Sequence, residues 1–363
     1  MERTPSLSVV IPTLGRPILI QTVKSLVAAQ GFDRLEVIVA GRIADGSVLD
    51  GLGQLCSQHP QIRHLSVAFK KGDSSEKKNA GFRASRADIV AFLDDDVVVA
   101  PDWPLRIVEP FADPRVGFVS GPSLVPDDLP LMGRLAGVVL ASKAAGYVSE
   151  RYLAGASGPR EAKWSRLIGC NMAYRRTVLE SIGLFDPAFW PGEEMIAAYR
   201  ATQAGHKLIF HPEATLHHYP RASLGRFVKQ IYGYGATRVR LFRAGVEFEP
   251  TTIVPAVWVL SLVLLGVGCL LPLFVRAALP WLGGALGGDG GASPFFRWCL
   301  GLLGLDLALY ALADAAIALA KFMETRRAVD LLIVFLIPVM HLTYGIAEWV
   351  ELFRPGKDLS EGG

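Results

Sequence analysis

Hydrophobic residues in the first 220 positions fall into short apolar runs that alternate with amphipathic stretches. The runs are Leu7–Ile11, Leu35–Ala40 and Ile89–Leu93. Such runs are typical of strands that are buried on both faces of a mainly parallel sheet. Helical periodicity over Pro17–Gln30 and Lys77–Ala87 lies between them. Strands that alternate with helices predict an α/β layer fold with right-handed crossovers.

Beyond residue 250 the pattern changes to long apolar stretches. Ile253–Val275, Cys299–Ala320 and Val329–Val350 are each long enough to cross a hydrocarbon layer of about 30 Å. Buried helices of a large soluble core are the alternative, but three such segments in a row lack a polar face for water. We therefore expect an α-helical transmembrane region of about three helices.

These patterns divide the chain into four parts. Residues 1–220 form the predicted α/β domain, 221–250 a basic interfacial segment, 251–352 the transmembrane region and 353–363 a tail. Arg221–Arg243 interleaves cations with aromatic and aliphatic residues, which is typical of a helix on anionic lipid. Lys and Arg before the first span and between the second and third predict that the α/β domain faces the cytoplasm.

Charge and cysteine usage exclude some classes of function. The net charge is only +3, which gives no bulk attraction to nucleic acid, so we expect no nucleic-acid partner. The four cysteines lie far apart. Their spacing indicates neither a zinc site nor a disulfide framework, and a reducing compartment is expected.

Three consecutive aspartates, Asp94–Asp96, follow the strand Ile89–Leu93. Side chains alternate along a strand, so Asp94 and Asp96 should point one way and Asp95 the other. Two carboxylates at a strand end suit a hard divalent cation, Mg²⁺ or Mn²⁺, that holds a diphosphate. The alternative is a solvated acidic turn, which a position directly after a buried strand disfavours.

Four segments together resemble the family 2 glycosyltransferases of the GT-A fold, over roughly the first 220 residues. They are SVVIPTLGRP, EVIVA, KKNAGFRASRADIVAFLDDDVVVAPDW and GCNMAYRRTVLESIGLFDPAFWPGEE. The resemblance implies a nucleotide-sugar-binding domain with a mainly parallel central sheet. The C-terminal part is similar to members that build extracellular polysaccharide or lipid-linked glycans.

The resemblance also implies a role for individual residues. Donor binding falls to Pro12, Thr13, Arg16, Asp45, Lys78, Asp94, Asp95 and Asn171. Asp96 would bind the metal, and His217 or His218 would complete the metal site. The catalytic base falls to Glu194, beside Glu193, and the acceptor side to Trp190 and Gln230.

Several of these assignments have alternatives. The family usually has an aspartate directly after the second strand, but here Gly41 follows Ala40, so either Asp45 takes that role or the contact is absent. Glu193 and Glu194 would also stabilise a helix simply as first-turn acids. Lys78 could be a surface charge at a helix N-terminus and Trp190 a packed aromatic residue.

The sequence as a whole predicts a membrane-bound, inverting, metal-dependent glycosyltransferase of the cytoplasmic membrane. It would transfer a sugar from a UDP- or GDP-sugar donor to a lipid-linked or glycan acceptor for cell-surface polysaccharide or glycoconjugate synthesis. Membrane lipids are expected partners. A processive polysaccharide synthase, a catalytically silent nucleotide-binding scaffold and a nucleotidyltransferase are the rival interpretations.

Overall fold

The computed structural model describes residues 6–69, 73–126, 128–152, 158–167, 169–219, 223–247, 249–278 and 294–354. The chain divides into two compact units. The α/β unit comprises Met1–Phe227, Arg240–Glu247 and Pro355–Gly363, and the helical unit comprises Val228–Val239 and Phe248–Arg354. The predicted tail beyond residue 354 and the glycine-rich segment 281–293 lie outside the described residues.

An eight-stranded sheet forms the centre of the α/β unit, with the strand order β3-β2-β1-β4-β9-β6-β10-β8. Its strands are β1 (Leu7–Pro12), β2 (Leu35–Ala40), β3 (Ile62–Leu65), β4 (Ile89–Leu93), β6 (Val116–Ser120), β8 (Arg160–Ala162), β9 (Asn171–Arg175) and β10 (Lys207–Phe210). β8 and β9 pair antiparallel with their neighbours and the other strands run parallel. The prediction of a mainly parallel sheet, with strands at the three apolar runs, is confirmed.

A second, three-stranded sheet begins where β4 ends. It contains β5 (Val97–Val99), β7 (Ser123–Leu124) and β11 (Leu216–His218), in the order β5-β11-β7. The aspartate triplet lies in the turn that joins β4 to β5, so it stands at the junction of the two sheets.

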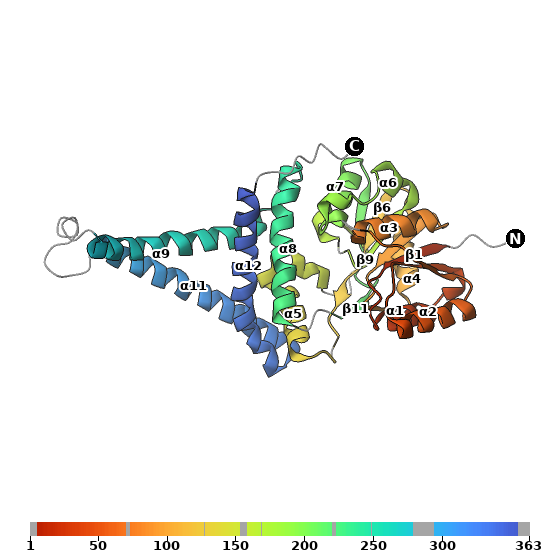
Figure 1. Cartoon of the computed structure of the whole chain (residues 1–363), viewed down its shortest axis with the longest axis horizontal. Coiled ribbons are helices and arrows are strands. Elements are labelled where there is room, and N and C mark those ends of the chain that lie inside the picture. Colours follow the sequence, from red (N-terminus) through yellow and green to blue (C-terminus); the bar gives the residue numbers. More distant parts are fainter. Residues whose placement is uncertain are drawn as a thin grey trace. The chain divides into compact units, whose positions relative to one another are not determined.

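Helices cover both faces of the large sheet (Figure 1). One face carries α1 (Leu19–Val27), α2 (Gly46–Gln58) and α4 (Trp103–Val108), and the other α3 (Asp73–Ala84), α6 (Arg176–Ser181) and α7 (Glu193–Gln203). Helix α5 (Leu131–Leu140) follows β7. Short 3₁₀ helices occupy Phe32–Arg34, Glu109–Ala112, Lys143–Tyr152, Trp164–Arg166, Pro187–Phe189, Pro250–Thr252 and Ala328–Leu332. Each face of the sheet therefore has its own apolar core.

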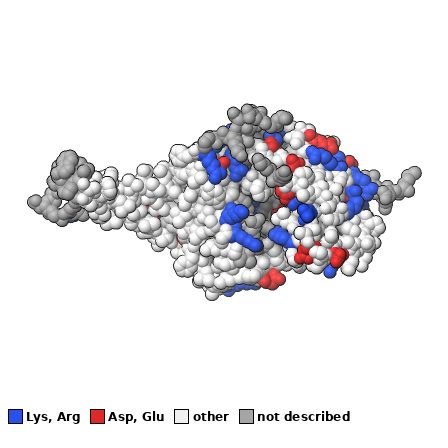
Figure 2. Space-filling model, viewed as in Figure 1, with Lys and Arg blue, Asp and Glu red and all other residues white. Residues whose placement is uncertain are grey.

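The helical unit contains three long apolar helices, α9 (Val254–Ala278), α11 (Pro294–Thr325) and α12 (Ile333–Phe353). They belong to three candidate membrane spans, Pro250–Val275, Pro294–Thr325 and Ala328–Phe353, with mean hydropathies of 2.5, 1.8 and 2.0. Figure 2 shows the viewed face of α9 and α11 almost free of charged residues. The predicted spans therefore coincide with helices that can cross a membrane.

Close helix packing and paired polar groups hold the helical unit together. A Cβ at Gly345 of α12 would meet the Pro255 carbonyl oxygen at 2.4 Å, so only glycine allows α9 so near. Tyr310 stacks on Trp258 and hydrogen-bonds His341 at 2.8 Å, which ties α11 to both α9 and α12. Such internal pairing is how polar groups are tolerated in a membrane.

Candidate active site

Two carboxylates and one imidazole meet at the junction of the sheets. Asp94, Asp96 and His218 each offer a ligand atom, and these atoms all lie within 4.8 Å of one another. Antiparallel pairing of β11 with β5 sets His218 opposite Val97, directly after the triplet. His217 is exposed because neighbouring side chains of a strand point to opposite faces. The fold thus brings His218, and not His217, to the aspartates.

The charges around this cluster favour a cation. Burial alone would raise the pKa of Asp96, but His218 and Arg16 outweigh burial and lower it to about 2. Burial and then repulsion from Asp96 raise the pKa of Asp94. Burial would lower the pKa of His218, but the two carboxylates raise it. The acids of the cluster therefore favour a nearby positive charge, which a bound cation would supply.

Asp95 faces away from this cluster, toward the loop after β1. Its carboxylate accepts hydrogen bonds from the Thr13 hydroxyl at 2.7 Å and the Leu14 amide at 3.1 Å. Arg16 forms ion pairs with both Asp95 and Asp96, the latter at 2.7 Å. The middle acid of the triplet therefore fixes the loop Pro12–Arg16 beside the candidate metal ligands.

Glu193 and Glu194 open helix α7 and differ sharply in environment. Both oxygens of Glu193 are engaged, because Oε1 accepts from the Lys78 amine at 2.9 Å and Oε2 from the Gly192 amide at 3.1 Å. Glu194 lies against Gly169, where an added Cβ would stand 3.3 Å from the Glu194 Cδ. Burial, and then the charge of Glu193, raise the pKa of Glu194 to about 7. Of the two, Glu194 is suited to accept a proton near neutral pH.

Asn171 is fully buried, and its side-chain amide forms hydrogen bonds within the protein. It donates to the carbonyls of Pro122 and Ala214 at 2.9 and 2.8 Å and accepts from the Trp103 indole at 2.9 Å. These bonds join β9 to the segments that lead into β7 and β11. The geometry therefore gives Asn171 a part in shaping the site rather than an open face for a ligand.

The other predicted residues are spread more widely. Asp45 is exposed and caps α2, accepting from the amides of Ser47 and Val48 at 2.9 and 3.4 Å. Trp190 is 51% exposed next to α7. Gln230 belongs to the helical unit and donates to the Tyr234 hydroxyl at 2.9 Å. Neither Asp45 nor Gln230 contributes an atom to the cluster of acids and imidazole.

The turn after β2 explains the missing aspartate of the family pattern. A Cβ at Gly41 would stand 2.2 Å from the Thr13 carbonyl oxygen, and its φ of 153° disfavours other residues. Any side chain here would push the β1 loop away. The end of β2 lies so close to the loop Pro12–Arg16 that this position has no room for an aspartate side chain.

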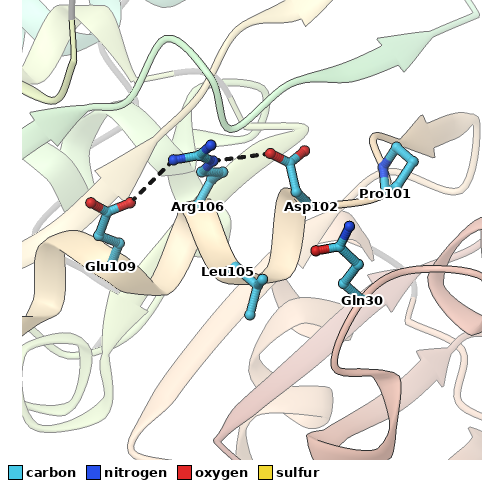
Figure 3. Close-up of a pocket in the computed structure, with 6 residues that line it drawn as sticks. All are labelled: Gln30, Pro101, Asp102, Leu105, Arg106 and Glu109. Atoms are coloured by element: carbon cyan, nitrogen blue, oxygen red, sulfur yellow. Dashed lines mark hydrogen bonds and ion pairs between the residues drawn. The ribbon is translucent and has the colours of Figure 1, made fainter.

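A hollow of about 490 Å³ lies beside α4, lined by Gln30, Pro101, Asp102, Leu105, Arg106 and Glu109 (Figure 3). Arg106 pairs there with Asp102 at 3.0 Å and with Glu109 at 3.7 Å. It also pairs with Glu213 at 3.0 Å. Among the described residues that line this hollow, Arg106 is the only cation, and three acids already pair with it, so this lining is poorly suited to an anionic donor.

Sequence reasoning missed two connections, namely the bridge from Arg16 to both Asp95 and Asp96 and the ion pair of Lys78 with Glu193. For Arg16, the order of strands along the chain was an available signal. Arg16 follows β1 and the triplet follows β4, and these adjacent parallel strands deliver their following loops to one edge. No comparable signal links Lys78 to Glu193, which lie 115 residues apart.

Comparison with known proteins shows the family of this chain. The family described as "Glycosyltransferase like family 2" matches residues 5–232, which is more than half of the chain. The chain belongs to this family. A solved structure, the mannosyltransferase PcManGT of Pyrobaculum calidifontis in complex with GDP-Man and Mn²⁺, aligns with 97% of this chain and 88% of its own at a TM-score of 0.56 and 17% identity. The predicted GT-A glycosyltransferase fold is thereby confirmed.

Three curated relatives share parts of the sequence of this chain. "Uncharacterized protein y4gI" of Sinorhizobium fredii is 29% identical over 62% of this chain and 26% of its own. The pre-mycofactocin glycosyltransferase of Mycobacterium tuberculosis is 26% identical over 50% and 37%. The GalNAc(5)-diNAcBac-PP-undecaprenol beta-1,3-glucosyltransferase of Campylobacter jejuni is 30% identical over 25% and 30%. The chain spans well under half the length of these relatives.

Proposed function

We propose that this protein is an inverting, metal-dependent glycosyltransferase that moves a sugar from a UDP- or GDP-sugar to a lipid-linked or glycan acceptor at the cytoplasmic membrane. The observation that carries the proposal is the cluster of Asp94, Asp96 and His218, with ligand atoms within 4.8 Å. It lies beside the loop Pro12–Arg16, which Asp95 holds in place. The donor diphosphate would lie between this loop and the cluster.

The residues of the cluster fit a divalent cation. Carboxylate oxygens and an imidazole nitrogen suit Mn²⁺ as well as Mg²⁺. Asp96 Oδ1 faces His218 Nε2 at 3.2 Å, so both atoms lie where one ion could contact them. A bound ion would offset the charge of the leaving diphosphate. Arg16, which pairs with Asp96 at 2.7 Å, would contact the same phosphates.

Glu194 supplies the base that a single displacement requires. The acceptor hydroxyl attacks the anomeric carbon, its proton passes to Glu194, and the nucleoside diphosphate leaves with the bonding electron pair. One base and one leaving-group site give inversion at the anomeric carbon. A base with a pKa of about 7 is largely ionised at slightly alkaline pH, yet basic enough to accept the proton.

Three features support a membrane acceptor and a cytoplasmic active site. The chain has three candidate spans within the described residues. One relative is named for a substrate linked to undecaprenol through a diphosphate. Lys and Arg precede the first span and also lie between the second and third, at Lys321, Arg326 and Arg327.

A donor panel tests the proposal directly. Membranes that contain the full chain are given UDP- and GDP-sugars with Mn²⁺ or Mg²⁺ and a polyprenyl-diphosphate sugar, and nucleotide release is measured. We expect release from one donor class, abolished by a chelator, restored by the metal and lost in Asp96→Asn. Asp33→Asn, an exposed acid of the same unit, is the matched control and should behave as wild type. No release from any donor would favour the silent scaffold.

A further inference from the structure

Helix α3 carries the sequence KKNAG, residues 77–81, and each of its functional groups reaches a different part of the site. We propose that Lys78 and Asn79 are positioning residues that hold the base-bearing segment Phe185–Glu194, while the neighbouring Lys77 holds the loop Pro12–Arg16, here called the donor loop. The inference rests on the proposed function. The family resemblance implies that Lys78 contacts the nucleotide, and the proposed positioning role takes the place of that contact.

Lys78 is enclosed among acids. Its side chain is 4% exposed and that of its partner Glu193 is 3% exposed, with 2.9 Å between amine and carboxylate. Burial alone would lower the pKa of this amine, but the surrounding carboxylates of Glu193, Glu194 and Asp94 outweigh burial and raise it. The amine therefore stays charged and neutralises the acids around the base. It has little surface left for a nucleotide.

Asn79 holds the start of the same segment. Its amide nitrogen donates to the Phe185 carbonyl at 2.7 Å, and its amide oxygen accepts from the Phe185 backbone at 3.0 Å. The Lys78 amine also stands over the Phe185 ring, 5.4 Å from its centre. Two consecutive residues of α3 thus fix both ends of the stretch from Phe185 to Glu193. Glu194 follows directly, so its position depends on these contacts.

Lys77 serves the opposite side of the site. Consecutive helical residues point about 100° apart, and the Lys77 amine donates to the Thr13 carbonyl at 2.8 Å. Thr13 is the residue whose hydroxyl bonds Asp95. Gly81 brings the helix against β1, because a Cβ there would meet a Val10 methyl at 2.3 Å. Helix α3 therefore contacts both the donor loop, through Lys77, and the segment that leads to Glu194, through Lys78 and Asn79.

Steady-state kinetics of the full chain in membranes separate the two lysines. Lys78→Met should lower kcat by on the order of 10²-fold, with the donor KM within about twofold of wild type. It should also move the acid limb of kcat/KM to higher pH, because Glu194 loses a neighbouring cation. Lys77→Met should instead raise the donor KM and leave the limb in place. Lys78→Arg, which keeps the charge, should recover part of kcat.

The opposite pattern would overturn the inference. A Lys78→Met variant with a raised donor KM and an unmoved acid limb would assign Lys78 to the nucleotide. Should Lys78→Met fail to fold, Glu193→Gln removes the other partner of the pair and must lower kcat without changing the donor KM. Failure of the proposed function is distinct, since the wild type would then release no nucleotide at all.

Discussion

Replacing Glu194 by glutamine should abolish transfer and yet stabilise the α/β unit at alkaline pH. The fold raises the pKa of this carboxyl from 4.5 to about 7. At 1.36 kcal/mol per pKa unit, keeping the ionised group in its site costs at most about 3 kcal/mol. Glutamine has nearly the same shape and never ionises, so the variant avoids this cost.

The sign of the effect follows from the direction of the shift. Below pH 4.5 the carboxyl is protonated in both the folded and the unfolded chain, and the cost is absent. Between pH 4.5 and 7 the unfolded chain loses its proton first, so wild-type stability falls as pH rises. Above pH 7 the full cost applies. The stability gain of Glu194→Gln should therefore grow from pH 4.5 to 7 and then stay constant.

Thermal unfolding in detergent without metal or donor measures this difference. For a unit of this size, about 3 kcal/mol corresponds to a Tm rise of roughly 6–12 °C at pH 8. The difference should vanish near pH 4.5. In the same pH series, wild-type kcat/KM should fall about tenfold per pH unit below 7, because the base must be ionised.

Two results would refute this reasoning. A Tm gain that is the same at pH 4.5 and pH 8 would show that the ionised carboxylate carries no special cost in the fold. Transfer by Glu194→Gln at a tenth of the wild-type rate or more would show that another group takes the proton. Glu193→Gln does not mimic the stability gain, because its two oxygens are already engaged by Lys78 and Gly192.

Two further predictions separate neighbouring or alternative roles. His218→Ala should weaken activation by Mn²⁺, measured as a higher metal concentration for half-maximal rate. His217→Ala should match wild type. Equal effects of the two variants would contradict the finding that His218, and not His217, lies at the acids. Asp45→Ala should lower the stability of the α/β unit slightly through the lost α2 cap and leave the donor KM within about twofold. The reason is that its carboxylate bonds only helix amides and Ser47 among the described residues. A large rise in that KM would instead assign Asp45 to the nucleotide.

The sequence was most informative where periodicity alone decides structure. The apolar runs at Leu7–Ile11, Leu35–Ala40 and Ile89–Leu93 coincide with β1, β2 and β4 to within one residue. Alternation along the strand also predicted that Asp94 and Asp96 share a side, as they do around His218. Both predictions depend only on local geometry, which the sequence carries directly.

Contacts between distant segments were beyond such reasoning. Lys78 and Glu193 come together because α3 and α7 cover the same face of the sheet, and helix rotation then decides which lysine meets which acid. One helical position separates Lys77, which meets the donor loop, from Lys78, which meets the base segment. The sequence alone also leaves the role of Asp45 open, since an N-cap and a ligand contact require the same residue type.

Helix α8, Leu224–Arg243, has a consequence for how the protein can be divided. Its residues Val228–Val239 belong to the helical unit, whereas Arg240–Glu247 belong to the α/β unit. Leu241 and Val246 are buried in the same apolar core as α6 and α7. A fragment cut at residue 220 would lack these side chains and leave a cavity in that core. During synthesis, likewise, the α/β unit is complete only after the ribosome has made the first segment of the helical unit.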